Sequence, residues 1–230
     1  MSAKSLENLR MRIRVIDQIE DDIPKFKIRR KNRSFLMKLL SVVLFFNKKF
    51  MTNYVTTIYP VVYVPDWWGI NKARQKAEIE ILAHEYVHLY DRKKMWWLFN
   101  LLYLSPQIFS LLAIGAFWNI SFLWCLLFLL PWPSPGRAWL EFRGYRMSLA
   151  MMYWMRIKGK AENADKRCTF IENYDITWVV GQFTGPAYYF MFPFKDYLGK
   201  KFRQTLEDIK DDNLSPELLK MKDRILKSQK

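Results

Sequence analysis

One uncharged stretch in the middle of the chain dominates its hydrophobic pattern. Residues 95–136 contain no Asp, Glu, Lys or Arg, although charged residues make up 26% of the sequence. A transmembrane helix needs roughly 20 apolar residues, so this stretch is long enough for two short spans or one long span. The segment from Gly115 to Ser121 predicts a turn, and we therefore expect an apolar helical hairpin. Trp and Tyr near both ends are typical of a membrane interface, which favours membrane contact over burial in a soluble core.

Basic residues flank the apolar stretch on both sides. Three precede it at positions 92–94, and Arg137, Arg143 and Arg146 follow it. Positively charged flanks mark the cytoplasmic ends of membrane segments. Both ends are therefore expected on the cytoplasmic side, which predicts a hairpin or an in-plane insertion and not a single crossing. The first fifteen residues are charged throughout, so no cleavable signal peptide is predicted.

The N-terminal segment, residues 1–49, is strongly basic and carries a second apolar run. It holds 13 Lys or Arg against 5 Asp or Glu, and six of the basic residues lie between positions 25 and 33. Residues 35–46 are nearly all apolar but too few to cross a bilayer, which predicts an interfacial or core helix with a basic collar. The whole chain has a net charge of +15, which indicates an anionic partner. Because apolar sequence follows the basic cluster directly, an anionic membrane surface is a better partner than nucleic acid.

The remaining segments predict a mostly helical α+β fold. Residues 54–64 are rich in Val, Ile, Thr and Tyr and predict a strand, which Pro60 would place at the edge of a small sheet. A helical pattern covers residues 72–92. Ser134 followed by Pro135 predicts the start of another helix, which should end near residue 158.

These elements suggest three parts along the chain. The basic N-terminal segment 1–49 comes first, and residues 50–195 form a main domain into which the hairpin 95–136 is inserted. Residues 196–230 are a charged, solvated helical tail in which Ser215 and Pro216 predict a helix start.

The helix predicted over residues 72–92 carries the motif with the clearest chemistry. His84-Glu85-Tyr86-Val87-His88 is an H-E-x-x-H sequence, and it contains the only two histidines of the chain. A spacing of four residues places both imidazoles on one helical face, where they can bind a single Zn²⁺ ion. Glu85, beside the first histidine, can then act as the general base toward a zinc-activated water.

A catalytic zinc ion commonly has three protein ligands, and the third must be a carboxylate here because no further His is present. Glu141 is the favoured candidate, since no other Asp or Glu lies between Asp91 and Glu141. Asp91, one turn after His88, is better placed to orient a histidine, as is Glu80. The other possible ligands lie in a polar stretch further along: Glu162, Asp165, Glu172 and Asp175.

This choice of ligands agrees with the hairpin predicted from the charges. A single crossing of residues 95–136 would leave His88 and Glu141 about 30 Å apart on opposite membrane faces. A hairpin returns the chain to the same side and makes a shared metal possible.

A zinc helix, an apolar hairpin and a helix bearing Glu together resemble the membrane-associated gluzincin metalloproteases, especially the CAAX prenyl endopeptidases and the HtpX-type proteases. The resemblance covers about residues 71–158. It implies a zincin-like fold and peptide-bond hydrolysis, with His84, His88 and Glu141 as zinc ligands and Glu85 as catalytic base. The second family motif is Glu-x-x-small-Asp, which corresponds here to residues 141–145, and the Asp position is Tyr145.

Further residues could complete a peptidase. The strand over residues 54–64 could pair with an extended peptide substrate. Tyr145, Tyr188 or Tyr189 could donate a hydrogen bond to the oxyanion of the tetrahedral intermediate. Two alternatives remain: a basic protein that binds membranes or nucleic acid without catalysis, and a pseudoenzyme that holds zinc but does not cleave.

Overall fold

The computed structural model describes residues 3–45, 47–71, 74–105, 107–117, 119–130, 132–157, 175–185 and 190–226. Helices dominate, and three short strands form one sheet, which confirms the mostly helical α+β fold class. The chain divides into two compact units, described separately below. The first comprises Met1–Lys94 and Ser215–Lys230, and the second comprises Met95–Leu214.

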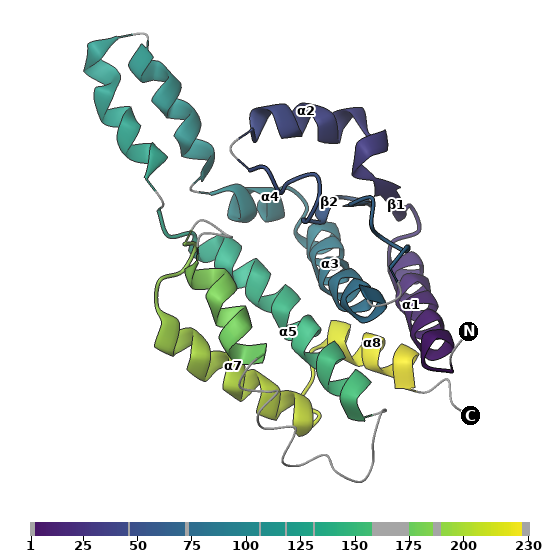
Figure 1. The fold of residues 1–230 in the computed structure, drawn as a ribbon. Coiled ribbons are helices and arrows are strands. Elements are labelled where there is room, and N and C mark those ends of the chain that lie inside the picture. The colour runs from purple at the N-terminus through teal and green to yellow at the C-terminus, as the bar shows by residue number, and fades with distance from the viewer. Residues whose placement is uncertain are drawn as a thin grey trace. The chain divides into compact units, whose positions relative to one another are not determined.

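Within the described residues, the first unit combines four α-helices with the small sheet (Figure 1). Its elements are α1 (Ala3–Asp22), β1 (Lys27–Arg30), the short 3-10 helix η1 (Lys31–Arg33), α2 (Phe35–Val43), β2 (Thr56–Ile58), β3 (Val61–Val64), α3 (Gln75–Met95) and α8 (Pro216–Leu226). The helix expected over residues 35–46 is therefore present, but it ends three residues earlier.

The sheet corrects the prediction of one continuous edge strand over residues 54–64. That segment forms two antiparallel strands, β2 and β3, and Pro60 lies in the turn between them. Proline has no amide hydrogen to donate to a sheet and suits a turn, so the hydrogen-bonding groups of β3 stay available on both sides. β3 is consequently the central strand, paired in parallel with β1, and β2 lies at an edge.

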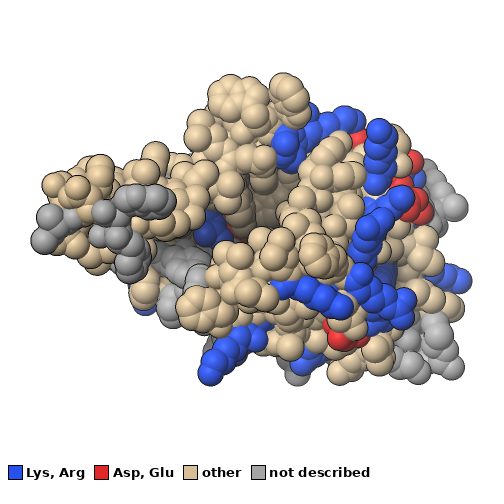
Figure 2. All heavy atoms as spheres, turned by 90° about the horizontal axis from the view of Figure 1, so that it is seen from above, with Lys and Arg blue, Asp and Glu red and all other residues tan. Residues whose placement is uncertain are grey.

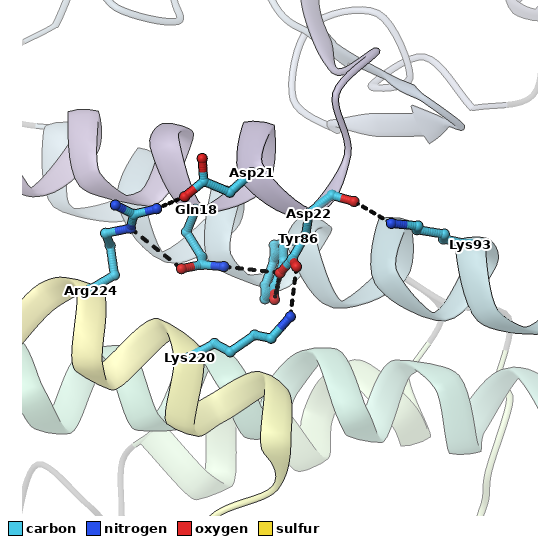
Figure 3. Close-up of polar contacts among 7 residues, drawn as sticks. All are labelled: Gln18, Asp21, Asp22, Tyr86, Lys93, Lys220 and Arg224. Atoms are coloured by element: carbon cyan, nitrogen blue, oxygen red, sulfur yellow. Dashed lines mark hydrogen bonds and ion pairs between the residues drawn. The ribbon is translucent and has the colours of Figure 1, made fainter.

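The helical part of the first unit is held by a polar network around the C-terminal end of α1 (Figure 3). Tyr86 of α3 and Lys220 of α8 both donate to the carboxylate of Asp22, over 2.6 Å each. Lys93 donates a hydrogen bond to the backbone oxygen of Asp22, and Gln18 donates one to the carboxylate of Asp22. One residue therefore connects three helices. The same three helices also bury apolar side chains, among them Val15, Ile19, Leu82, Leu218 and Met221.

The second unit contains the apolar stretch and two long helices. Its elements are α4 (Trp97–Leu104), the 3-10 helices η3 (Gln107–Phe117) and η4 (Ile120–Leu129), α5 (Pro135–Ile157), a helical segment over residues 175–184 and α7 (Lys195–Lys210). η3 and η4 run side by side, which confirms the predicted helical hairpin (Figure 1). Within the described residues, none of the helices has the length and apolar character needed to cross a bilayer.

The N-terminal end of α5 packs tightly against α4. As predicted, α5 begins directly after Ser134, whose hydroxyl donates to the backbone oxygen of Ser105 at the end of α4. Gly136 lies at a close approach of the two helices, because a Cβ atom there would lie 2.9 Å from the backbone oxygen of Leu102. Any larger residue would push α4 and α5 apart.

The charged tail is two helices. α8 begins at Pro216, as predicted, and belongs to the first unit, whereas α7 belongs to the second. Each helix buries one apolar face, formed by Leu218, Met221 and Ile225 in α8 and by Leu198, Phe202, Leu206 and Ile209 in α7.

Candidate metal centre

The two histidines meet on one face of α3, as their spacing predicts. His84 and His88 lie one helical turn apart, and both are buried. Their Nε2 atoms are 3.0 Å apart, and the rings meet edge to face with centroids 4.8 Å apart. Both imidazoles therefore direct the same nitrogen toward a common point.

This arrangement fits a zinc ion. Two nitrogens bound to one tetrahedral zinc at about 2.1 Å lie roughly 3.4 Å apart, which is close to the separation observed. Imidazole nitrogen is also a preferred zinc ligand. The geometry and the chemistry of the pair are thus suited to one metal ion.

Glu85 is held by the edge strand of the sheet. The hydroxyl of Thr57, in β2, donates a hydrogen bond of 2.6 Å to Oε2 of Glu85. Glu85 is half-buried, whereas both histidines are buried. The carboxylate expected to act as a base thus has a fixed oxygen and remains partly accessible. Nothing in the sequence identified Thr57, because its contact with Glu85 spans 28 residues.

A buried lysine lies close enough to influence Glu85 electrostatically. Lys31 is almost completely buried, and its Nζ donates to the backbone oxygen of Phe50 over 2.7 Å. The same ammonium group lies 3.9 Å from the centroid of the Phe50 ring. Burial lowers the pKa of Lys31 to about 8, and the negative charge of Glu85 acts in the opposite direction.

The basic cluster at residues 25–33 was expected to face an anionic membrane surface. The structure corrects this expectation for Lys31 and Arg30. Lys31 points into the first unit, and Arg30 donates hydrogen bonds to the backbone oxygens of Asp66 and Trp68. Buried cations need such partners, which a lipid surface would not supply. These two residues therefore stabilise the fold, while the other members of the cluster are exposed.

Glu141 occupies a defined position in the second unit. It lies on the second turn of α5 and is almost completely buried. Its Oε1 accepts a hydrogen bond of 2.7 Å from the hydroxyl of Tyr103 in α4. The guanidinium carbon of Arg137 lies 4.9 Å from the centroid of the Tyr103 ring. Nothing in the sequence links Tyr103 to Glu141, because 38 residues separate them.

The three predicted ligands, His84, His88 and Glu141, are all buried. The histidines belong to the first unit and Glu141 to the second. That all three bind one metal ion is part of the proposed function. Among the alternative carboxylates, Asp91 and Asp175 are also buried. Glu162, Asp165 and Glu172 lie outside the described residues.

Of the three tyrosines proposed to stabilise the oxyanion, the structure describes Tyr145. Tyr145 is buried in the second unit, where its ring packs against Trp178 and Phe183. A role in the core therefore accounts for its position. Tyr188 and Tyr189 lie outside the described residues.

Comparison of the chain with models of known protein families, with curated proteins and with solved structures found no match.

Proposed function

We propose that the protein is a membrane-associated zinc metallopeptidase. The observation that carries this proposal is the pair of Nε2 atoms of His84 and His88, 3.0 Å apart, with Glu85 beside them on α3. Zinc peptidases with an H-E-x-x-H helix use these residue types as two ligands and a general base. The resemblance to the gluzincin proteases, which rests on the motifs, points to the same chemistry.

Glu141 is the proposed third ligand. A catalytic zinc ion commonly has three protein ligands, and the histidines supply two of them. Glu141 is a buried carboxylate whose second oxygen, Oε1, already accepts from Tyr103. Partners of this kind orient a ligating carboxylate, which supports Glu141 over the solvent-exposed acids of the chain.

A bound zinc ion would polarise the scissile carbonyl group and lower the pKa of the attacking water. Glu85 would take the proton from that water and deliver it to the leaving amine. Thr57 holds one oxygen of Glu85, so the carboxylate keeps a fixed orientation while it exchanges the proton. β2, which carries Thr57, lies at the edge of the sheet and is the strand with which an extended peptide substrate would pair. Tyr145 remains a candidate donor to the oxyanion.

The membrane part of the proposal rests on exposed apolar side chains in the hairpin. Residues of η3 and η4 that are exposed include Leu111, Ile114, Leu123, Trp124, Leu127 and Leu129. Apolar surfaces of this extent mark contacts with membranes or other proteins. Together with the charge of +15, they favour an anionic membrane surface, with the zinc site on its cytoplasmic side.

Zinc content tests the metal centre directly. Plasma mass spectrometry on the full-length protein in detergent should give one zinc per chain. His88→Ala and Glu141→Ala should each lose most of it, whereas Glu207→Ala, at an exposed position of α7, should retain it. A folded protein without zinc would contradict the proposal and favour the non-catalytic membrane-binding alternative. Zinc that survives Glu141→Ala would redirect the search for the third ligand to Asp91 or Asp175.

Catalysis is tested by one further substitution. Glu85→Gln should retain zinc but lose hydrolysis of a peptide library at least 1,000-fold, because the amide cannot accept the proton. If the wild-type protein binds zinc and cleaves nothing, the pseudoenzyme alternative holds.

A further inference from the structure

α2 is a helix with two opposite apolar faces. Its inner face, formed by Met37, Leu40 and Leu44, packs against Phe50 and Tyr63 in the first unit. The N-terminal end of the helix is capped, since the side chain of Ser34 accepts from the backbone nitrogen of Met37. α2 is therefore anchored to its own unit by one face alone.

The outer face of α2 is apolar and exposed to solvent. Phe35 is 81% exposed, Val42 70% and Val43 62%, and Leu36 and Leu39 are also exposed. At 100° per residue these five positions fall on the side of the helix opposite Met37 and Leu44. Phe45, just after the helix, is 79% exposed as well. A soluble protein gains nothing from such a face, so a partner should cover it.

The charges around α2 indicate what that partner is. Between residues 23 and 65 the sequence contains nine Lys or Arg and no Asp or Glu. Arg33, Lys38, Lys48 and Lys49 are exposed immediately before, within and after the apolar face. Figure 2 looks from the side on which α2 lies in Figure 1, and far more basic than acidic surface is visible there. The partner must therefore offer apolar groups and negative charge together.

An anionic lipid bilayer has both properties. A second copy of this chain would bring the same basic collar against itself and be repelled. Helices with an apolar face and flanking lysines lie in the plane of a bilayer, with the apolar face at the level of the upper acyl chains and the lysines among the headgroups.

We propose that α2 is an in-plane membrane helix, inserted by Phe35, Leu39, Val42 and Val43 and held by Arg33, Lys38, Lys48 and Lys49. This inference deepens the membrane part of the proposed function and does not depend on zinc or catalysis. It assigns the first unit a membrane contact of its own, in addition to the hairpin of the second.

Spin labels at three positions of the full-length protein test the insertion. Val42→Cys reports on the outer face of α2, Leu127→Cys on the hairpin, and Lys76→Cys on the exposed start of α3. All three are made with Cys125 and Cys168 replaced by Ala, and reconstituted into vesicles of phosphatidylcholine with 30% phosphatidylglycerol. We expect the label at position 42 to lose contact with a water-soluble nickel chelate several-fold and gain contact with oxygen, while the label at position 76 stays in water.

The labels separate the possible failures. If position 127 inserts and position 42 stays in water, α2 is not a membrane helix, although the hairpin still is. If neither inserts, the whole membrane part of the proposed function is wrong. Spin–spin broadening at position 42 without lipid would show that a second copy covers this face and would overturn the proposal.

A charge variant tests the lipid class. Lys48→Gln with Lys49→Gln should weaken binding to the anionic vesicles by roughly 30-fold, since each lysine near an anionic surface contributes a factor of about five. The matched control, Lys195→Gln with Lys200→Gln on α7, removes the same charge from exposed positions and should change it less. Equal losses in both variants would contradict a specific role for the collar of α2.

Discussion

The hydroxyl of Thr57 lies 2.6 Å from Oε2 of Glu85 and donates a hydrogen bond to it. This contact connects the edge strand of the sheet with the centre of the helix that carries both histidines. A carboxylate that must receive a proton in one orientation benefits from such a restraint, because fewer of its conformers are unproductive. Thr57 is thus a positioning residue, acting through Glu85.

Replacing Thr57 by Val should impair turnover without removing the metal. Valine has nearly the shape of threonine but cannot donate, so Glu85 loses its restraint. We expect kcat to fall roughly 5- to 10-fold at nearly constant KM, which corresponds to about one hydrogen bond. The measurement uses a fluorogenic peptide selected from a library, together with the zinc content. Thr57→Ser should restore most of the rate, whereas equal losses in both variants would indicate a packing defect.

Tyr103 should contribute to metal affinity through Glu141. Its hydroxyl donates to Oε1, and loss of a partner of this kind typically weakens metal binding 10- to 100-fold. Tyr103→Phe is therefore expected to raise the zinc dissociation constant about 10-fold, measured by competition with a chelating dye. Tyr197→Phe, at an exposed position of α7, serves as the control. Unchanged affinity in Tyr103→Phe would argue against Glu141 as a ligand.

The histidine pair could be predicted because its geometry is local. A spacing of four residues is one helical turn, so the sequence alone places His84 and His88 on one face of one helix. The starts of α5 and α8 were predictable for the same reason, since Ser134 with Pro135 and Ser215 with Pro216 act within one turn. Features that depend only on a few neighbouring residues can be predicted from the sequence, because tertiary packing does not change them.

The contacts of Glu85 and Glu141 could not be predicted in this way. Thr57 and Tyr103 reach them across 28 and 38 residues, and tertiary packing alone decides which hydroxyl meets which carboxylate. Pro60 shows a related difficulty. Its missing amide hydrogen suits both an edge strand and a turn, and the pairing of β3 with β1 selects the turn. Composition likewise left residues 35–46 as either an interfacial or a core helix, and only the packing of α2 on Phe50 and Tyr63 shows which face stays exposed.

Lys31 should give the folding stability a distinctive pH dependence. Its pKa is about 8 in the folded protein, below its ordinary value of 10.5, because it is buried. Between these values the unfolded chain binds more protons than the folded one, so the free energy of unfolding rises with pH. The gain from this residue is on the order of 2 kcal/mol between pH 8 and pH 10.5.

Lys31→Met should remove that rise. Urea unfolding of the metal-free protein at pH 7.5, 8.5 and 9.5 gives the slope for each variant, and other titrating groups cancel in the difference. Parallel slopes in the wild type and Lys31→Met would show that Lys31 keeps an ordinary pKa.

Asp22 should stabilise the first unit at neutral pH and lose this effect in acid. Burial alone would raise the pKa of its carboxyl group, but hydrogen bonds from Lys220, Tyr86 and Gln18 outweigh burial and leave the pKa lowered. A carboxylate with a lowered pKa stabilises the folded state above its unfolded pKa, and this contribution disappears as the pH falls through the folded pKa. At pH 7, Asp22→Asn should therefore cost about 2 kcal/mol, because hydrogen bonds to a charged group are lost.

The neighbouring acid provides a matched control for this prediction. Asp21 pairs with Arg224, but its side chain is 63% exposed (Figure 3). An exposed ion pair contributes little, so Asp21→Asn should cost less than about 0.5 kcal/mol. Urea unfolding at pH 7, 5, 4 and 3 measures both variants. The deficit of Asp22→Asn should shrink below about pH 4, as the wild-type carboxylate becomes protonated. A deficit that stays constant down to pH 3 would mean that Asp22 acts through its shape and not through its charge.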